Sequence, residues 1–247
     1  MSVPLWAIEM AAAFWRDAGG EEDVPRGLRR PIAIALPLTV VSLPRLRLTG
    51  IDAWLRNQDI HCRLDVPDRP LRACLVAQHG QGFVFIDGTD AEDEQRFSLA
   101  HETAHFLREY QGRRQVAVGR LGPRILEVLD GDRPARPEER IDALLARVPI
   151  GLHVHLMDRA DDGQHANAAI DAAERDADIL AYELLAPSGA VLGEVAPYPP
   201  AEQRAAATDR LVTTYRLPPR VARRYAAFLV PSMDRSDSFI RRLGLAP

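Results

Sequence analysis

One short motif constrains this 247-residue chain more than any other feature of its sequence. The motif is His101-Glu102-Thr-Ala-His105, within the stretch 97–107. Residues four apart share one face of a helix, so His101 and His105 can offer their imidazoles to a single metal ion. Glu102 lies beside that face, where it can accept a proton from an attacking water and pass it to a leaving amine. The alternatives are a chance match on a core helix and a degenerate site without metal.

A catalytic zinc site needs a third protein ligand and one position that stays open. A second helix, predicted over 167–186, carries Glu174 and Asp178 four residues apart on one face. We predict that Glu174 is the third ligand. We also predict that Asp178 accepts a hydrogen bond from the far nitrogen of a ligand histidine, which fixes the tautomer of that imidazole. A solvated acidic helix face is the alternative for both residues.

These two motifs together resemble those of the ImmA/IrrE family of metallopeptidases, which are gluzincin-like. Family members are similar to Phe-Thr-Leu-Ala-His-Glu-x-x-His-x-Leu, followed by Glu-x-x-Ala-Asn/Asp-x-x-Ala-x-x-Leu-Leu-x-Pro. The corresponding stretches here are 97–107 and 174–187. The resemblance implies a zincin-like α+β domain, a zinc cofactor, and endoproteolysis of a helix-turn-helix transcriptional repressor in a regulatory or stress response. Mn²⁺ or another divalent ion is an alternative to zinc, because metal availability often decides which ion is bound.

The spacing of the two motifs departs from the family pattern. Between His105 and Glu174 lie 68 residues, 106–173, which is longer than the resemblance leads us to expect. We predict an insertion at about 111–165 that shapes or covers the cleft. The insertion contains His153 and His155, which would share one face of a strand, and also His165. These three histidines are candidates for extra ligands or for stabilising an oxyanion, as is Tyr182 more weakly. Ordinary polar surface or structural hydrogen bonds are the alternative.

Periodicity and turn residues predict the remaining elements. Alternating apolar residues indicate strands at 60–66, 71–78 and 83–87, which would form a small antiparallel sheet, and a further strand is predicted at 150–157. A helix is predicted over 5–18, and Thr49 is expected to cap another that ends near residue 57. Thr89 and Glu92 resemble a capping box that would open the motif-bearing helix, which should run to about Tyr110. Short helices are predicted at 123–129 and 137–147, a turn at 161–163, and loops at 21–31 and 193–200.

The fold class expected is α+β, with a metallopeptidase domain over 1–192 and a helical lobe over 193–247. Within the lobe, helices at 201–216 and 218–230 flank a Leu-Pro-Pro break, and several arginines follow, among them Arg220, Arg223 and Arg224. This outline resembles a helix-turn-helix, which could contact DNA or dock a DNA-bound repressor. An ordinary helical lobe with solvated arginines is the alternative.

Two rival functions remain open at this point. The chain could be a DNA- or repressor-binding module with a vestigial metal site, although an intact His-Glu-x-x-His motif argues against degeneration. It could also be a metal-dependent hydrolase of some other bond. The net charge of −4 excludes nucleic-acid binding by overall charge alone. The most apolar stretch, 32–43, is too short to span a bilayer, and the N-terminus lacks the pattern of a secretory signal. We therefore expect a cytoplasmic protein without a membrane partner.

Overall fold

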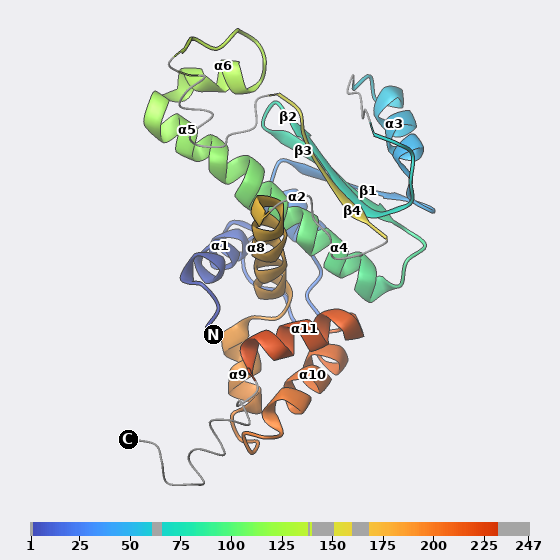
Figure 1. The fold of residues 1–247 in the computed structure, drawn as a ribbon, viewed down its shortest axis with the longest axis vertical. Helices are drawn as coiled ribbons and strands as arrows, with labels where there is room; N and C mark the ends of the chain where they lie inside the picture. The colour runs from blue at the N-terminus through green and yellow to red at the C-terminus, as the bar shows by residue number, and fades with distance from the viewer. Residues whose placement is uncertain (1, 61–65, 138, 140–150, 160–167, 232–247) are drawn as a thin grey trace.

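The computed structural model of the protein describes residues 2–60, 66–137, 139, 151–159 and 168–231. A four-stranded sheet lies in the upper right part of the view in Figure 1. The strands are β1 (Leu38–Leu43), β2 (Leu71–Gln78), β3 (Gln81–Asp87) and β4 (His153–Asp158), in the spatial order β1-β3-β2-β4. The three strands predicted at 71–78, 83–87 and 150–157 are therefore present.

The sheet is mixed rather than wholly antiparallel. β2 runs antiparallel to β3, as predicted, and also to β4, whereas β1 runs parallel to β3. Sequence patterns do not predict β1, which forms the second half of the apolar stretch 32–43. The chain leaves β1 through helix α3 (Leu48–Asn57) and returns to the sheet at β2, so β1 joins β3 by a crossover that strand-by-strand patterns do not reveal.

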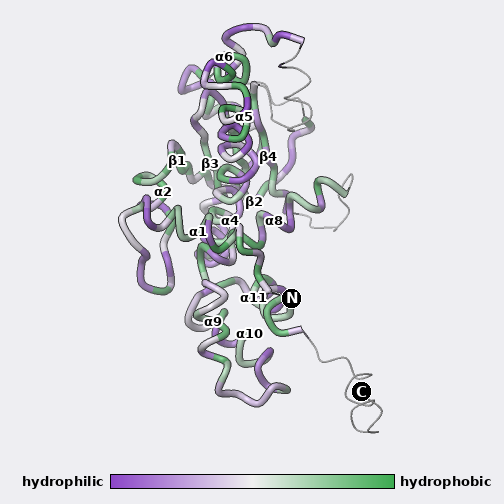
Figure 2. The backbone as a smooth tube through the Cα atoms, turned by 90° about the vertical axis from the view of Figure 1, so that its left-hand side faces the viewer, coloured by the Kyte–Doolittle hydropathy of each residue, from purple (hydrophilic) through white to green (hydrophobic). Residues whose placement is uncertain are grey.

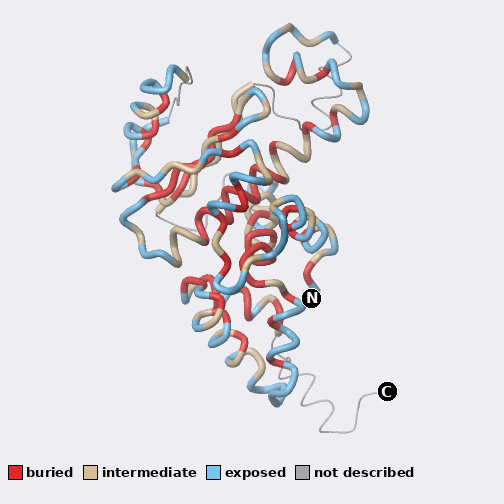
Figure 3. The backbone as a smooth tube through the Cα atoms, turned by 180° about the vertical axis from the view of Figure 1, so that it is seen from behind, coloured by how far each residue is buried: buried red, intermediate tan, exposed pale blue. Residues whose placement is uncertain are grey.

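Side chains alternate between the two faces along each strand. Each face of the sheet packs against helices, α3 on one side and α4 (Glu92–His105) on the other. Cys74, Val76 and Phe85 pack with Ile51 and Leu55 of α3 in one buried cluster. The opposite face belongs to a larger buried cluster that it shares with α4. The strands are hydrophobic along much of their length (Figure 2), and buried residues concentrate in the sheet, α4 and α8 (Figure 3). The motif-bearing helix α4 is thus a core element of the fold.

The helix that carries the motif is longer than predicted. α4 continues without a break into a π-helix at Phe106–Gly112 and then into α5 (Arg113–Leu121), so that one long helical rod crosses the sheet (Figure 1). The π-helical segment begins directly after His105. Segments of this kind occur often beside functional sites, where they change the direction in which successive side chains point.

Both predicted helix caps are wrong. Ala91 precedes α4 without a side-chain cap, because the Thr89 hydroxyl donates a hydrogen bond to Asp87 at 2.6 Å. Thr49 lies inside α3, and its backbone N–H donates to Asp68 at 3.1 Å. Neither helix therefore begins at the position that its capping pattern requires, since α4 begins after Ala91 and α3 after Arg47.

The remaining helices are α1 (Leu5–Asp17), α2 (Arg29–Ala35), a short 3-10 turn at Pro123–Ile125, α6 (Leu126–Leu129), α8 (Ala168–Leu185), α9 (Ser188–Val195), α10 (Gln203–Thr213) and α11 (Pro219–Leu229). Among them, α8 packs most extensively against α4. The helices predicted at 5–18, 123–129, 167–186, 201–216 and 218–230 are confirmed. The predicted loop 21–31 contains the start of α2, and α9 ends within the predicted linker 193–200. The strand predicted at 60–66, the helix at 137–147, the turn at 161–163 and His165 lie largely or wholly outside the described residues.

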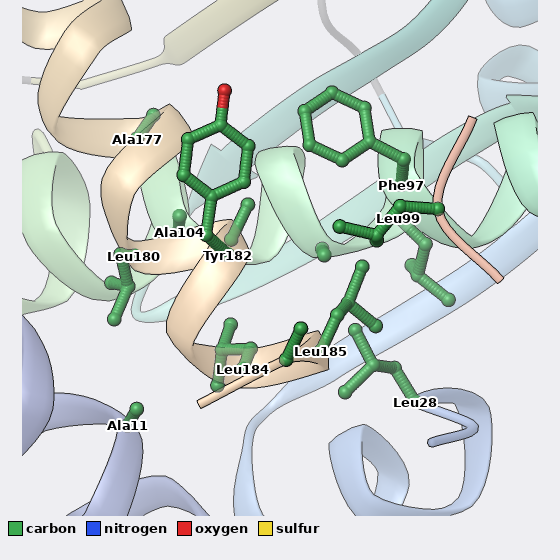
Figure 4. Close-up of a cluster of buried hydrophobic side chains, with 14 of the residues drawn as sticks. Ala11, Leu28, Phe97, Leu99, Ala104, Ala177, Leu180, Tyr182, Leu184 and Leu185 are labelled. Carbon is green, nitrogen blue, oxygen red and sulfur yellow. The ribbon is translucent and has the colours of Figure 1, made fainter. Parts of the chain in front are cut away.

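One buried cluster extends from the sheet into the C-terminal helices. Phe97 and Leu185 belong to it, together with Val191, Leu211 and Tyr225 from α9–α11, and Figure 4 shows Phe97, Leu99, Tyr182 and Leu185 converging within it. The domain boundary at 192/193 stays a prediction. In the described part of the chain, no helix combines the length and apolarity that crossing a membrane requires.

Candidate metal centre

The motif residues lie in the buried C-terminal part of α4, which ends at His105. The exposed fraction is 3% for His101, 0% for Glu102 and 2% for His105. Buried polar side chains require hydrogen-bonding or charged partners, because water no longer solvates them. On the same helix Phe97 and Ala104 are buried in the apolar cluster, so the surrounding core fixes the orientation of the motif.

The partners come from α8, which packs against α4. Glu174 Oε2 lies 3.2 Å from His101 Nε2, and Glu174 Oε1 lies 3.7 Å from His105 Nε2. The two Nε2 atoms of His101 and His105 are 3.1 Å apart. The predicted third ligand therefore meets the two motif histidines, although 68 residues separate it from them in the sequence.

These distances fit a tetrahedral ion. Donor atoms bound to one such ion at about 2.0–2.1 Å lie about 3.3 Å from one another. The two histidine nitrogens are 3.1 Å apart, and each lies 3.2 or 3.7 Å from one of the two oxygens of Glu174, which is close to this value. Two imidazoles and one carboxylate are also the kind of donor set that a catalytic zinc site uses. His101, His105, Glu174 and a fourth residue, His155, form a group that could hold a metal ion.

Asp178 lies one turn after Glu174 on α8 and faces the other side of the His101 ring. Its Oδ1 is 3.1 Å from His101 Nδ1, so His101 can donate a hydrogen bond to it while keeping Nε2 free for a metal. The second carboxylate oxygen accepts a hydrogen bond from Arg224 of α11 at 3.1 Å. A chain of contacts thus connects the C-terminal helices with the ring of His101.

His155 reaches the same group from β4. Its Nδ1 lies 2.9 and 3.1 Å from the two carboxylate oxygens of Glu102, and its Nε2 lies 2.8 Å from Glu174 Oε1. The His155 ring stacks on His105, with 3.6 Å between the ring centroids. The sequence analysis named His155 only as one of several weak candidates.

The other weak candidates lie elsewhere. His153 is on the same face of β4, but its ring approaches Tyr110, with the centroids 5.9 Å apart. Tyr182 is 3% exposed, and its ring stacks on those of Phe97 and Tyr225. Figure 4 shows it beside Phe97. Among the described residues, neither His153 nor Tyr182 belongs to the group that could hold a metal. Burial raises the pKa of the Tyr182 phenol far above its ordinary value, and the nearby Asp178 charge adds to this shift.

The titratable side chains of this group change one another's pKa values. Burial alone would lower the pKa of His101, but Asp178 and Glu174 raise it to about 10. His155 shows the same balance, since Glu102 and Glu174 outweigh burial and raise its pKa to about 9. Burial lowers the pKa of His105. The neighbouring histidines outweigh burial at Glu174 and hold its pKa far below the ordinary range. A metal that binds Nε2 of His101 would therefore have to compete with a proton.

Comparison with known protein families identifies this part of the chain. Residues 57–124 match the model of the Peptidase_M78 family, described as the IrrE N-terminal-like domain. The chain contains an ImmA/IrrE metallopeptidase domain. The match includes β2, β3, α4 and α5, and it ends before β4 and α8. The assignment of His155 and Glu174 to the site therefore rests on the geometry of this structure. The chain has no significant match among curated proteins or among solved structures.

Two arginines of α11 contact acidic residues of α4 and α8. Arg220 donates to Glu94 of α4 at 3.1 Å, and Arg224 donates to Asp178. Arg223, between them in sequence, is exposed. Two of the three arginines proposed for DNA or partner contact therefore form hydrogen-bonded ion pairs with acidic residues of the same chain.

A second group that could hold a metal lies near the β2–β3 turn. It consists of His79, Asp130 and Asp132, of which His79 and Asp132 are exposed. Arg114 already neutralises Asp130, at 2.8 Å. The group lacks the burial and the complete set of partners that distinguish the group on α4.

Proposed function

We propose that this chain is a zinc-dependent endopeptidase that cleaves a helix-turn-helix transcriptional repressor in a regulatory or stress response. His101, His105 and Glu174 would hold the metal, Glu102 would be the general base, and Asp178 would orient His101. The observation that carries this proposal is the convergence of the His101 and His105 nitrogens on α4 with the Glu174 carboxylate on α8, at 3.1–3.7 Å.

The chain's own residues supply three contributions to hydrolysis. A bound zinc ion would polarise the scissile carbonyl and make water a better nucleophile at neutral pH. Glu102, next to His101 and without exposed surface, would take the proton from the attacking water and deliver it to the leaving amine. Asp178 would keep the Nδ1 proton on His101, which leaves Nε2 as the ligand atom.

The position of β4 favours a polypeptide as the substrate. β4 lies at one end of the strand order and carries His155 into the site. In the described part of the chain, β2 is the strand that pairs with it. The unpaired backbone groups of an edge strand can bind an extended peptide by strand addition. A scissile bond held this way would lie beside the metal group, which supports a peptidase over a hydrolase of other bonds.

The test is to incubate the protein with candidate helix-turn-helix repressors encoded near it. Wild-type protein should produce one discrete cleavage, in an exposed loop or linker of the repressor, because the cleft needs an extended segment. The Glu102→Gln variant should bind the same metal and leave the repressor intact. Absence of cleavage of every neighbouring regulator, together with salt-dependent binding of duplex DNA, would favour the DNA-binding rival instead.

A further inference from the structure

His155 belongs to the metal group by distance, but its ring is oriented unlike that of a ligand. Two imidazoles that bind one tetrahedral ion through Nε2 diverge from each other, which places their centroids about 5 Å apart. The His101 and His105 rings fit this value, with centroids 4.8 Å apart. The His155 and His105 rings do not, because they stack with centroids 3.6 Å apart and an interplanar angle of 24°. The His155 ring therefore stacks on the ring of His105, and it does not diverge from it as a second ligand of the same ion would.

The two ring nitrogens of His155 instead face two carboxylates. Nδ1 lies 2.9 Å from Glu102 Oε2 and Nε2 lies 2.8 Å from Glu174 Oε1. Carboxylates only accept hydrogen bonds, so each nitrogen donates. Hydrogen bonds of this kind between charged groups are stronger than those between neutral groups. His155 thereby connects the proposed general base with the proposed third ligand.

We propose that His155 is a positioning residue that fixes both of these carboxylates, an inference that rests on the proposed metallopeptidase function. At Glu174 it holds Oε1, which leaves Oε2 as the oxygen nearest to His101. Oε1 also lies 3.7 Å from His105 Nε2, so the contact with His155 decides whether a metal would meet one oxygen of Glu174 or both. With Oε1 held, Glu174 would offer Oε2 alone, and one position would stay open for water, as catalysis requires. At Glu102 it restrains the carboxylate beside that open position.

The sheet fixes the position of His155. Leu75 of β2 is its partner in the register, and the neighbouring Val154 and Leu156 point to the opposite face and pack against the α3 cluster. His153, two residues earlier, shares the face of His155 and pairs with Ala77. His153 contacts Tyr110 rather than a carboxylate, so it provides a matched control on the same strand.

The experiment uses Co²⁺ as the probe, because its visible absorption reports the number of ligands and is stronger for four than for five. Two substitutions at His155 distinguish its contact with Glu102 from its contact with Glu174, because each should keep one and remove the other. The amide of glutamine can replace the donor at Nε2, whereas the amide of asparagine can replace the donor at Nδ1. His155→Gln should therefore keep the wild-type Co²⁺ spectrum. His155→Asn should release Glu174 Oε1, let Glu174 bind through both oxygens, and weaken the absorption. His153→Gln should leave the spectrum unchanged, and thermal unfolding would check that each variant is folded.

Each outcome decides between alternatives. Wild-type spectra for both His155 variants would overturn the positioning role. A loss of Co²⁺ binding in both variants as large as that in Glu174→Ala would also overturn it, because His155 would then be a ligand. The proposed function fails separately, if the wild-type protein itself binds no Co²⁺.

Discussion

The two halves of the candidate metal site are built in different ways. α4 supplies His101, Glu102 and His105 from five consecutive residues, so helical spacing alone brings them together. The other half comes from β4 and α8, where His155, Glu174 and Asp178 are spread over 24 residues and two kinds of element. The family match covers the first half and ends before the second. The first half is thus recognisable from local sequence, and the second depends on how the whole chain folds.

The two halves should therefore contribute differently to metal binding and catalysis. The α4 half is fully buried and its geometry follows from the helix, whereas the β4–α8 half determines which carboxylate oxygens face the metal. Substitutions in the first half should abolish function outright. Those in the second half should act in graded steps, according to the distance of each residue from the metal.

The largest effect should come from Glu102 in the α4 half. Glu102→Gln removes the proton acceptor but keeps the volume of the side chain, so peptide cleavage should fall roughly 10²–10⁴-fold. Metal content and thermal stability should stay near wild type. Glu92→Gln, an exposed change in the first turn of the same helix, is the matched control. Cleavage by Glu102→Gln at the wild-type rate would contradict the mechanism.

In the β4–α8 half, Glu174 should have the largest effect on metal affinity. Glu174→Gln removes a charged ligand, so affinity should fall by more than the roughly 10–100-fold that loss of an outer hydrogen-bond partner costs. Asp171→Asn, one turn earlier on α8, is the control. Normal affinity in Glu174→Gln, with lost affinity in His155→Ala, would exchange the roles of these two residues.

Sequence patterns identified α4 and α8 because their functional residues recur at helical spacing. They also placed His153 and His155 on one face of a strand. They could not decide which of the two histidines enters the site, because that depends on the pairing of His155 with Leu75. The parallel strand β1 was missed for the same reason, since its partner β3 lies across a crossover in the sequence. Long-range register is a property of the assembled sheet.

Asp178 and Arg224 should give smaller effects, because they act on the metal through His101. Asp178→Asn should lower metal affinity roughly 10–100-fold. Arg224→Gln should lower it less, since 59% of the Arg224 side chain is exposed and solvent screens its charge. Arg223→Gln makes the same change of charge on the exposed face of α11 and should have no effect. Equal effects of the two arginine changes would show that general charge, rather than the contact with Asp178, is responsible.

The smallest expected effect concerns Asp87, whose contacts hold the end of β3 next to the end of β4. Asp87, at the end of β3, accepts hydrogen bonds from Leu46 and Thr89 and pairs with Arg159, the residue after β4. Burial alone would raise its pKa, but the hydrogen bonds from Thr89 and Arg159 lower it to about 2. A lowered pKa stabilises the fold above the unfolded value near 3.8, and this stabilisation is lost as the pH falls towards 2.

Asp87→Asn should therefore destabilise the protein near neutral pH by about 2 kcal/mol. The difference from wild type should narrow by about 1 kcal/mol when the pH is lowered from 6 to 3. Urea unfolding at the two pH values measures both quantities. A difference that does not change with pH would show that the Asp87 charge contributes nothing to stability.

The central claim is that residues from both halves hold one metal ion. Its most direct test is metal analysis after equilibrium dialysis of the wild-type protein and the His105→Ala and Glu174→Ala variants against Zn²⁺. We expect one tightly bound ion per wild-type chain and greatly weakened binding in each variant, one substitution from each half. A wild-type protein that retains no ion, or a Glu174→Ala variant that binds as tightly as wild type, would contradict the claim.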